Sequence, residues 1–297
     1  MNNLLSLNSL ELLFQLYKRD LNVLNKVDLK IFKGEKIAVV GESGSGKSVM
    51  LRIILGLLNY RNAIIRGDVL FESVNLREKD DYYYRQHIRG KNISMIFQDP
   101  MASLNPVFTI RDQMTNVIKL RDSKLTKNQV EEIANIELNK VSIHDSKRVL
   151  DSYPFQLSGG MAQRVLIVMA LMNNPKLVLA DEPSTALDVT LQKQALELMD
   201  KLTNKVNAAV LLVTHNLGVV REFAERVYVI YKGTIVEEGP VKDIFNNPKH
   251  PYTIALLEAI PRITGSGLPK FDSNPPKYEK IEKYTHTSLE KYYEKFA

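Results

Sequence analysis

The chain has 297 residues, of which 44% are apolar, with 40 Lys and Arg, 34 Asp and Glu, 14 Gly, 12 Pro and no Cys. This composition is typical of a globular protein with a buried core and excludes a chain that is disordered throughout. The absence of cysteine excludes a disulfide framework, a thiol nucleophile and a cysteine-ligated zinc or iron–sulfur centre. The net charge of +6 is modest and spread along the chain, so no basic block predicts nucleic-acid binding.

The longest apolar run covers residues 165–172, well short of the roughly 18 to 20 residues that a membrane-spanning helix needs. The N-terminus carries no basic region and no cleavage pattern of small residues. We therefore expect a chain that does not cross a membrane, has no signal peptide and stays in the cytosol.

The first third of the chain predicts strands, a loop and a helix. Residues 4–40 alternate like paired strands, and the β-branched run 36–40 is typical of a strand buried on both faces. A glycine-rich loop follows, and residues 49–58 then have apolar positions at helical spacing. The local order is therefore strand, loop and helix.

The rest of the chain alternates between strands and helices. Residues 101–155 are rich in Asn, Lys and Glu and look mostly helical. We expect strands at 92–97, 177–180, 209–214 and 227–231, and helices at 165–172 and 187–204. This alternation predicts a mainly parallel sheet in an α/β domain. From residue 263 the composition changes to Gly, Pro, Lys, Glu and Tyr, which predicts an appendage or mobile tail.

The glycine-rich loop fits the pattern G-x-x-x-x-G-K-[ST] between a strand and a helix, which is the context that this phosphate-binding motif requires. Its residues are Gly41, Glu42, Ser43, Gly44, Ser45, Gly46, Lys47 and Ser48. Glycines let backbone N–H groups turn toward a phosphate, and the helix N-terminus adds its positive dipole end. We expect Lys47 to bind the β- and γ-phosphates and Ser48 to offer its hydroxyl to Mg²⁺.

A second apolar strand ends in two carboxylates, Asp181 and Glu182. Beside a phosphate loop, we expect these two residues to differ in role. Asp181 would hold Mg²⁺ through water, and Glu182 would orient or polarise the attacking water.

Three further motifs complete a resemblance to a known family. They are Leu157 to Arg164 (LSGGMAQR), Asp181 to Asp188 (DEPSTALD), and Thr214 with His215. With the phosphate loop, their order resembles that of the ATPase subunit of an ABC transporter: phosphate loop, glutamine loop, signature, acidic motif, D-loop and switch histidine. The resemblance implies ATP and Mg²⁺ as ligands. It also implies a P-loop NTPase core of RecA type, with an N-terminal antiparallel β-subdomain and an inserted α-helical subdomain.

The resemblance assigns further site residues. The signature residues Ser158, Gly159 and Gly160 would bind the γ-phosphate of an ATP molecule that the phosphate loop of a partner subunit holds. They stand at the start of an apolar helix, and the free N–H groups at a helix start can bind an anion. Gln98 would bind the metal or the attacking water, and His215 would contact the γ-phosphate and Glu182. The adenine would stack on Phe14, with Tyr17 as the alternative.

Two longer segments, residues 88–106 and 247–253, look like those of oligopeptide, dipeptide and nickel importers. Within that group, the phosphate loop is similar to that of the first of two ATPase subunits. The resemblance spans residues 4–262, with a helical subdomain at about 101–160 and a C-terminal importer motif at about 233–262. In this interpretation residues 1–262 form the ATPase domain and residues 263–297 the tail.

The importer resemblance implies partners and a location. It predicts a second ATPase subunit, two permease subunits and, indirectly, an extracytoplasmic substrate-binding protein, with no nucleic acid. The chain would lie on the cytoplasmic face of the cell membrane. The cargo stays open between peptides and nickel or metal chelates. A DNA-repair type of ATPase is a remote alternative, because between Lys47 and Ser158 there is no heptad pattern for the long coiled coil of that class.

Two local features carry further expectations. The segment after Gln98, including Pro100, Met101, Leu104 and Pro106, is expected to dock a permease helix, with packing inside the helical subdomain as the alternative. His250 stands beside Pro251 and is expected to form a structural turn, because a single His beside Pro is a poor metal-ligand set.

Overall fold

A computed structural model describes residues 3–17, 19–58, 61–183, 189–259 and 283–296. The chain divides into two compact units. The first comprises residues 1–79 and 211–297, and the second comprises residues 80–210. Among the described residues, no helix combines the length and the apolar character that crossing a membrane requires.

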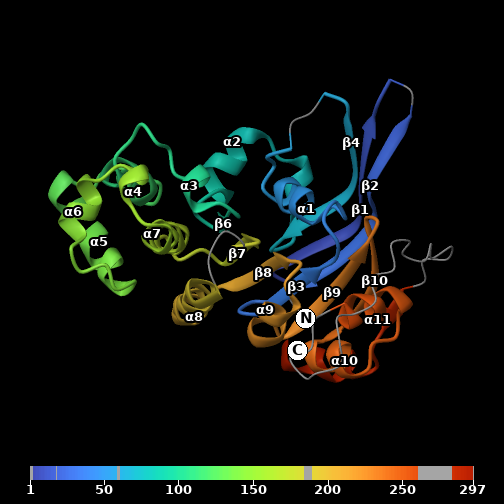
Figure 1. The fold of residues 1–297 in the computed structure, drawn as a ribbon. Coiled ribbons are helices and arrows are strands. Elements are labelled where there is room, and N and C mark those ends of the chain that lie inside the picture. The colour runs from blue at the N-terminus through green and yellow to red at the C-terminus, as the bar shows by residue number, and fades with distance from the viewer. Residues whose placement is uncertain (1–2, 18, 59–60, 184–188, 260–282, 297) are drawn as a thin grey trace. The chain divides into compact units, whose positions relative to one another are not determined.

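An antiparallel sheet forms one part of the first unit, with strand order β2-β1-β4-β5. The strands are β1 (Leu5–Gln15), β2 (Asp20–Ile31), β4 (Ala63–Phe71) and β5 (Val74–Asn75) (Figure 1). Leu7 lies opposite Leu29 of β2 and Val69 of β4, and all three side chains are buried. The paired strands that the sequence predicts before residue 40 are therefore confirmed.

A second group of strands in the first unit carries the phosphate loop. β3 (Lys36–Val40) is buried along its whole length and pairs in parallel with β9 (Arg226–Tyr231), which pairs with the antiparallel β10 (Thr234–Pro240). The helices of this unit are α1 (Lys47–Ile54), α9 (Leu217–Phe223), α10 (Val241–Asn246), α11 (Pro251–Glu258) and α12 (Ser288–Tyr293), with short 3₁₀ turns at Leu76–Glu78 and Glu294–Phe296.

Helix α1 ends earlier than the predicted stretch to residue 58. Gly56 has φ of 61°, a left-handed conformation that glycine adopts at little cost. Its N–H donates to the carbonyl of Ile53, and the N–H of Leu57 donates to the carbonyl of Arg52. These two bonds form a Schellman motif, which satisfies the last carbonyls and stops the helix.

The C-terminal end of the chain differs from the predicted tail. Residues 260–282 lie outside the described residues, but β11 (Tyr284–Thr285) pairs in parallel with β10, and α12 follows it. Tyr292 donates to Glu35, and Glu35 accepts from the fully buried Arg226 at 2.8 Å. A buried guanidinium needs hydrogen-bonding partners, and Tyr293 supplies one of them. Residues 283–296 therefore pack as an appendage of the first unit and not as a mobile tail.

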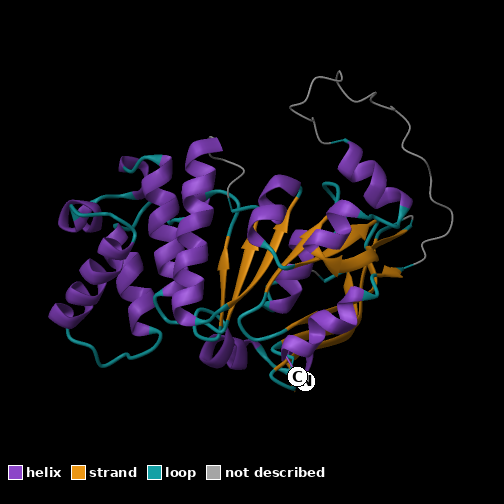
Figure 2. Cartoon of the chain, turned by 90° about the horizontal axis from the view of Figure 1, so that it is seen from below, coloured by secondary structure: helices purple, strands orange, loops and turns teal. Residues whose placement is uncertain are grey.

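The second unit is mostly helical around two parallel strands, β6 (Ile93–Ile96) and β7 (Leu177–Asp181). Most of its helices lie at the left of Figure 2. They are α2 (Asp81–Tyr83), a π-helical turn (Tyr84–Ile88), α3 (Pro100–Ser103), α4 (Ile110–Lys119), α5 (Lys127–Lys140), α6 (Ser146–Asp151), a 3₁₀ turn (Pro154–Gln156), α7 (Gly159–Leu171) and α8 (Val189–Val206). β8 (Ala209–Thr214) is fully buried and divided between the units. The predicted helical character of residues 101–155 is confirmed.

Local sequence explains why helices begin here. Thr109 is the capping residue of α4: its side chain accepts from the N–H of Asp112, and the side chain of Asp112 accepts from the N–H of Thr109. Thr126 and Gln129 form the same pair of hydrogen bonds at the start of α5. These are capping boxes, which satisfy N–H groups that a helix start would otherwise leave without partners. The predicted elements at 177–180, 187–204 and 227–231 are each found within two residues of the expected bounds.

Candidate functional site

The phosphate loop lies between β3 and α1, as the motif predicts. Gly46, directly before α1, has φ of 97°, and a Cβ atom there would lie 2.6 Å from Leu24 Cδ2. Only glycine fits this conformation at such a close approach. The phosphate loop therefore leads into α1 without an intervening residue, and the backbone N–H groups of the loop lie at the N-terminus of this helix.

The side chain of Lys47 is held inside this loop. Its Nζ donates to the carbonyls of Gly41 and Glu42, at 2.8 Å each, and the residue is only 5% exposed. A desolvated ammonium group beside helix N–H groups is a donor set that fits an anionic phosphate. Ser48 stands next to it in the first turn of α1 and is partly exposed.

In the second unit, Gln98 and Glu182 come together. β6 and β7 run in parallel with Ile96 opposite Ala180, so the residues two positions further on lie side by side. Gln98 Nε2 donates to Glu182 Oε2 at 3.1 Å. Equal spacing past two paired strands therefore juxtaposes two of the residues that the sequence predicts for catalysis.

Glu182 also has an unusual backbone. Its φ is 45°, a left-handed conformation that costs a non-glycine residue on the order of 1 to 3 kcal/mol. Asp181 before it is the last residue of β7 and is 7% exposed. The strained turn places a partly exposed carboxylate directly after a buried one, and such strain concentrates at functional sites.

The signature lies at the start of α7. Ser158 caps the helix by accepting from the N–H of Met161 at 3.3 Å, and Ser158 and Gly159 are exposed while Leu157 is buried. An exposed helix N-terminus opened by Ser-Gly-Gly can donate to an anion outside the chain.

Gln163 lies within the signature motif, but no role for it was predicted. Its Nε2 donates to the carbonyl of Pro183 at 2.7 Å, and the residue is 1% exposed. This bond ties α7, which carries the signature, to the turn after Glu182. A polar residue within an apolar helix was the only sequence signal for it.

His215, Phe14 and Tyr17 lie in the first unit. His215 follows β8 and is exposed. Asn216 caps α9 by accepting from the N–H of Gly218 at 3.0 Å. Phe14 is partly buried in β1, whereas Tyr17 is 99% exposed. The choice between these two aromatic rings for adenine stacking stays a prediction. Residues 184–188 of the D-loop lie outside the described residues.

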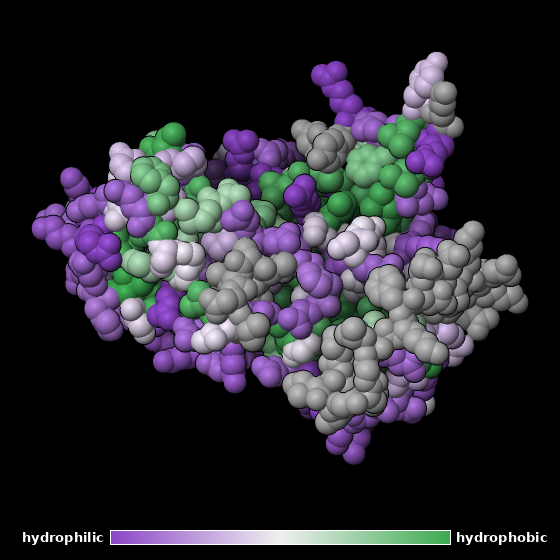
Figure 3. Space-filling view, viewed as in Figure 1, coloured by the Kyte–Doolittle hydropathy of each residue, from purple (hydrophilic) through white to green (hydrophobic). Residues whose placement is uncertain are grey.

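The predicted docking segment needs a correction. Leu104 is 1% exposed and Pro100 is buried, so both pack inside the helical unit, which was the alternative interpretation. The N–H of Ile110 donates to the carbonyl of Ser152, and this bond joins the loop before α4 to the segment after α6. The exposed apolar side chains on these segments, here called the apolar face, are Met101, Val107, Phe108, Tyr153 and Phe155. Figure 3 shows apolar surface over this part of the helical unit.

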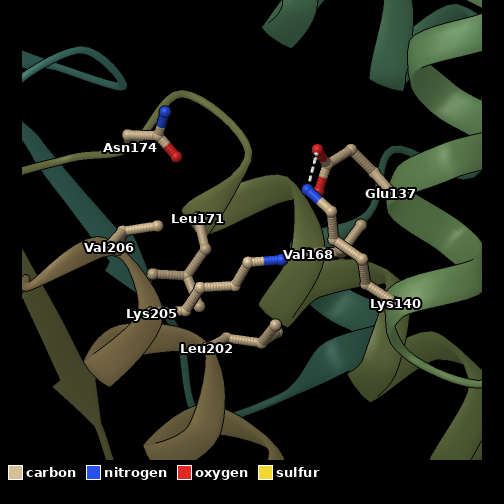
Figure 4. A pocket seen from close by; sticks show the side chains of 8 residues that line it. All are labelled: Glu137, Lys140, Val168, Leu171, Asn174, Leu202, Lys205 and Val206. Carbon is tan, nitrogen blue, oxygen red and sulfur yellow. Dashed lines mark hydrogen bonds and ion pairs between the residues drawn. The ribbon is translucent and has the colours of Figure 1, made fainter.

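A cavity of about 360 Å³ lies elsewhere in the second unit, between α5, α7 and α8 (Figure 4). Its lining includes the ion pair of Glu137 with Lys140 and the side chains of Val168 and Leu171, from the C-terminal half of α7. None of the predicted site residues lines it. The described residues also hold no group of three or more His, Asp or Glu side chains that could bind a metal.

Comparison with known proteins defines the class. Residues 24–185 match the ABC transporter family, and residues 236–285 match the C-terminal region of oligopeptide/dipeptide transporters. A solved dimeric ATP-binding cassette in a post-hydrolysis state, bound to ADP and Pi, has a TM-score of 0.70 and 29% identity over 80% of this chain and 98% of its own. The predicted P-loop NTPase fold is therefore confirmed.

Relatives narrow the family. The oligopeptide transport ATP-binding protein AppD of Bacillus subtilis is 44% identical over 93% of this chain and 87% of its own length. The dipeptide transport ATP-binding protein DppD of the same organism is 44% identical over 93% of this chain and 83% of its own length. The chain belongs to the ATP-hydrolysing subunits of ABC transporters, within the oligopeptide/dipeptide branch.

Proposed function

We propose that this chain binds and hydrolyses ATP to drive the import of peptides through two permease subunits at the cytoplasmic face of the cell membrane. The proposal rests mainly on the hydrogen bond between the side chains of Gln98 and Glu182, whose backbone is in a strained left-handed conformation. The same chain also has the phosphate loop that holds Lys47. The oligopeptide and dipeptide names of its relatives support the cargo class.

The site residues divide by role. The loop from Gly41 to Ser48 binds the phosphates, and Lys47 supplies the positive charge opposite the β- and γ-phosphates. Ser48, Gln98 and Asp181 hold Mg²⁺, which neutralises charge on the phosphates. Glu182 accepts a hydrogen bond from the attacking water and orients it, while His215 donates to the γ-phosphate. Phe14 or Tyr17 stacks on the adenine.

The ATP site is completed by a second subunit. Ser158 and Gly159 are exposed at the start of α7, and helix N–H groups at an exposed start can bind a phosphate that another chain holds. We propose that Ser158, Gly159 and Gly160 bind the γ-phosphate on a second, different ATPase subunit. An extracytoplasmic binding protein delivers the peptide.

Replacement of Glu182 by Gln tests the proposed reaction. The variant keeps the shape of the side chain but removes the charge that positions water, so ATP binding stays near the parental value while turnover falls by about a hundredfold or more. The matched control is Glu197→Gln on the exposed face of α8, which keeps parental turnover. Parental turnover in Glu182→Gln within the assembled transporter would show that Glu182 is not the catalytic carboxylate.

Uptake assays test the cargo. In membrane vesicles with the assembled transporter, ATP-dependent uptake of labelled peptides should require an intact Glu182. Uptake of nickel or a metal chelate, but not of peptides, would replace the peptide proposal with the metal alternative and leave the ATPase proposal standing.

A further inference from the structure

Helix α11 contacts the phosphate loop directly. The backbone N–H of Glu42 donates to the hydroxyl of Tyr252 at 3.0 Å, although the two residues are 210 positions apart. Tyr252 is 4% exposed, and its ring packs on Tyr231 of β9 with centroids 4.4 Å apart. Because the ring is buried and packed, the hydroxyl oxygen of Tyr252 is held at one position, where it accepts from the N–H of Glu42.

The peptide group on which this bond acts is also held at its carbonyl, that of Gly41, which accepts from Lys47 Nζ at 2.8 Å. In the next peptide group, the carbonyl of Glu42 accepts from Lys47 Nζ at 2.8 Å and from the N–H of Ser45 at 3.2 Å. Gly41 lies against β9, because a Cβ atom there would be 2.2 Å from the carbonyl oxygen of Ile230. The entry of the loop is therefore fixed by β9, by Lys47 and by Tyr252.

Tyr252 is itself anchored through the segment before α11. His250 is 2% exposed and caps the helix, since its Nδ1 accepts from the N–H of Tyr252 at 3.0 Å. The structural role expected for His250 is thus confirmed. The N–H groups of Lys249 and His250 both donate to the carboxylate of Glu237, at 2.8 and 3.0 Å.

Glu237 extends the anchor to the C-terminal end of the chain. It is fully buried on β10, and its Oε1 lies 2.8 Å from Nε2 of His286, just after β11. The contacts form a continuous series from His286 through Glu237 and the start of α11 to Tyr252 and the phosphate loop. Every member lies in the first unit.

We propose that Tyr252 is a positioning residue for nucleotide binding: it holds the Glu42 peptide so that the phosphate loop keeps its shape before the nucleotide arrives. Tyr252 acts through the backbone of the loop and does not itself touch the phosphate. Preorganisation of this kind improves affinity because less of the binding free energy is spent on ordering the loop. The inference rests on the proposed phosphate site at residues 41–48.

The test is Tyr252→Phe in the full chain, with Mg²⁺ and ADP as the ligand and calorimetry as the readout. Removing one hydroxyl leaves the packed ring in place. The loss of one hydrogen bond to the loop raises the dissociation constant of ADP about two- to tenfold. Hydrogen exchange at the Glu42 amide becomes faster in the free protein. Tyr284→Phe is the matched control, because it removes the same hydroxyl from a ring that packs edge-on against His250. In this control, the dissociation constant of ADP and the exchange rate of the Glu42 amide stay at parental values.

Two outcomes separate this inference from the phosphate site on which it rests. Lys47→Ala abolishes ADP binding if the phosphate site is assigned correctly. If Lys47→Ala loses ADP while Tyr252→Phe keeps parental affinity and amide exchange, the positioning role is overturned. If Lys47→Ala binds ADP like the parent, the phosphate site itself is wrong. A fall in melting temperature of Tyr252→Phe without any change in affinity also overturns the proposal, since it shows a role in stability alone.

Discussion

Single side chains at the start of α11 link the stability of the first unit to pH. Burial lowers the pKa of His250 below its ordinary value of 6.5, and the charge of Glu237 opposes this only in part. Its Nδ1 accepts a backbone hydrogen bond, which only the neutral ring can do. Glu237 behaves differently. Although burial alone would raise its pKa, hydrogen bonds from Lys249, His250 and His286 hold the pKa below 4.5.

His250 should therefore destabilise the fold under mildly acidic conditions. The unfolded chain takes up the proton first as the pH falls, so the stabilisation is complete above about pH 6.5 and is lost from there down to the lowered folded pKa. In urea unfolding at pH 7.5 and 5.5, His250→Asn keeps a capping side chain but cannot titrate, so its stability falls less than that of the parent. His144→Asn, at an exposed position, keeps the parental decline. Equal declines for His250→Asn and the parent would contradict this role.

At the scale of elements, the apolar face joins two segments of the second unit. Tyr153 and Phe155 stack with ring centroids 5.6 Å apart. Asn105 and Gln113 bond reciprocally and fix the loop that carries Val107 and Phe108. Val107 and Phe155 are 71% and 67% exposed. Aromatic and aliphatic side chains gathered on a rigid, exposed face are typical of a protein–protein interface.

We expect the apolar face to bind a permease helix. Val107→Asp combined with Phe155→Asp should weaken assembly with the permeases by about tenfold or more, because two charges would be buried in the contact. Stability changes by less than about 0.5 kcal/mol, since both positions are exposed. Co-purification with the permeases and chemical unfolding measure the two effects. Ile136→Asp is the control, because this α5 residue is an apolar side chain that is 50% exposed and lies outside the apolar face. Normal assembly of the double variant would place the contact elsewhere.

At the scale of the molecule, the proposed site residues occur in both units. Lys47, Ser48 and His215 belong to the first unit, whereas Gln98 and Glu182 belong to the second. The signature at Ser158 is exposed at the start of its helix. If it binds the nucleotide of another subunit, the isolated chain is a poor ATPase and activity requires pairing.

A mixing experiment tests this pairing. Lys47→Ala chains keep an intact signature, and Ser158→Arg chains keep an intact phosphate loop. In a homodimer of this chain, used as a test system in place of the pair with a different subunit, the two variants combine into one complete site. The mixture then hydrolyses ATP while neither variant does so alone. In the control, Lys47→Ala is mixed with the double variant Lys47→Ala, Ser158→Arg, which supplies no intact phosphate loop and should remain inactive. Full turnover by a purified monomer, independent of concentration, would contradict the pairing.

The sequence by itself determined the features that depend on short stretches of chain. The phosphate loop needs only glycines and Lys47 between a buried strand and a helix, and the capping residues Thr109 and Thr126 act within three positions. Motif order also supported the roles of Glu182 and Ser158. Each of these features depends on backbone geometry and polarity within one or two turns of chain, and that information is local.

Tertiary structure alone decided the contacts between distant parts of the chain. Leu104 is as apolar as an interface residue, but its burial depends on the helices around it. Tyr252 meets Glu42 across 210 positions, and residues 283–296 pack on β10 and Arg226 despite a composition typical of a tail. Such contacts form because certain groups need hydrogen-bonding partners. These groups are a buried charge, the free edge of a strand, and the carbonyl and N–H groups of a loop. Which residue supplies that partner depends on how the strands and helices pack in space.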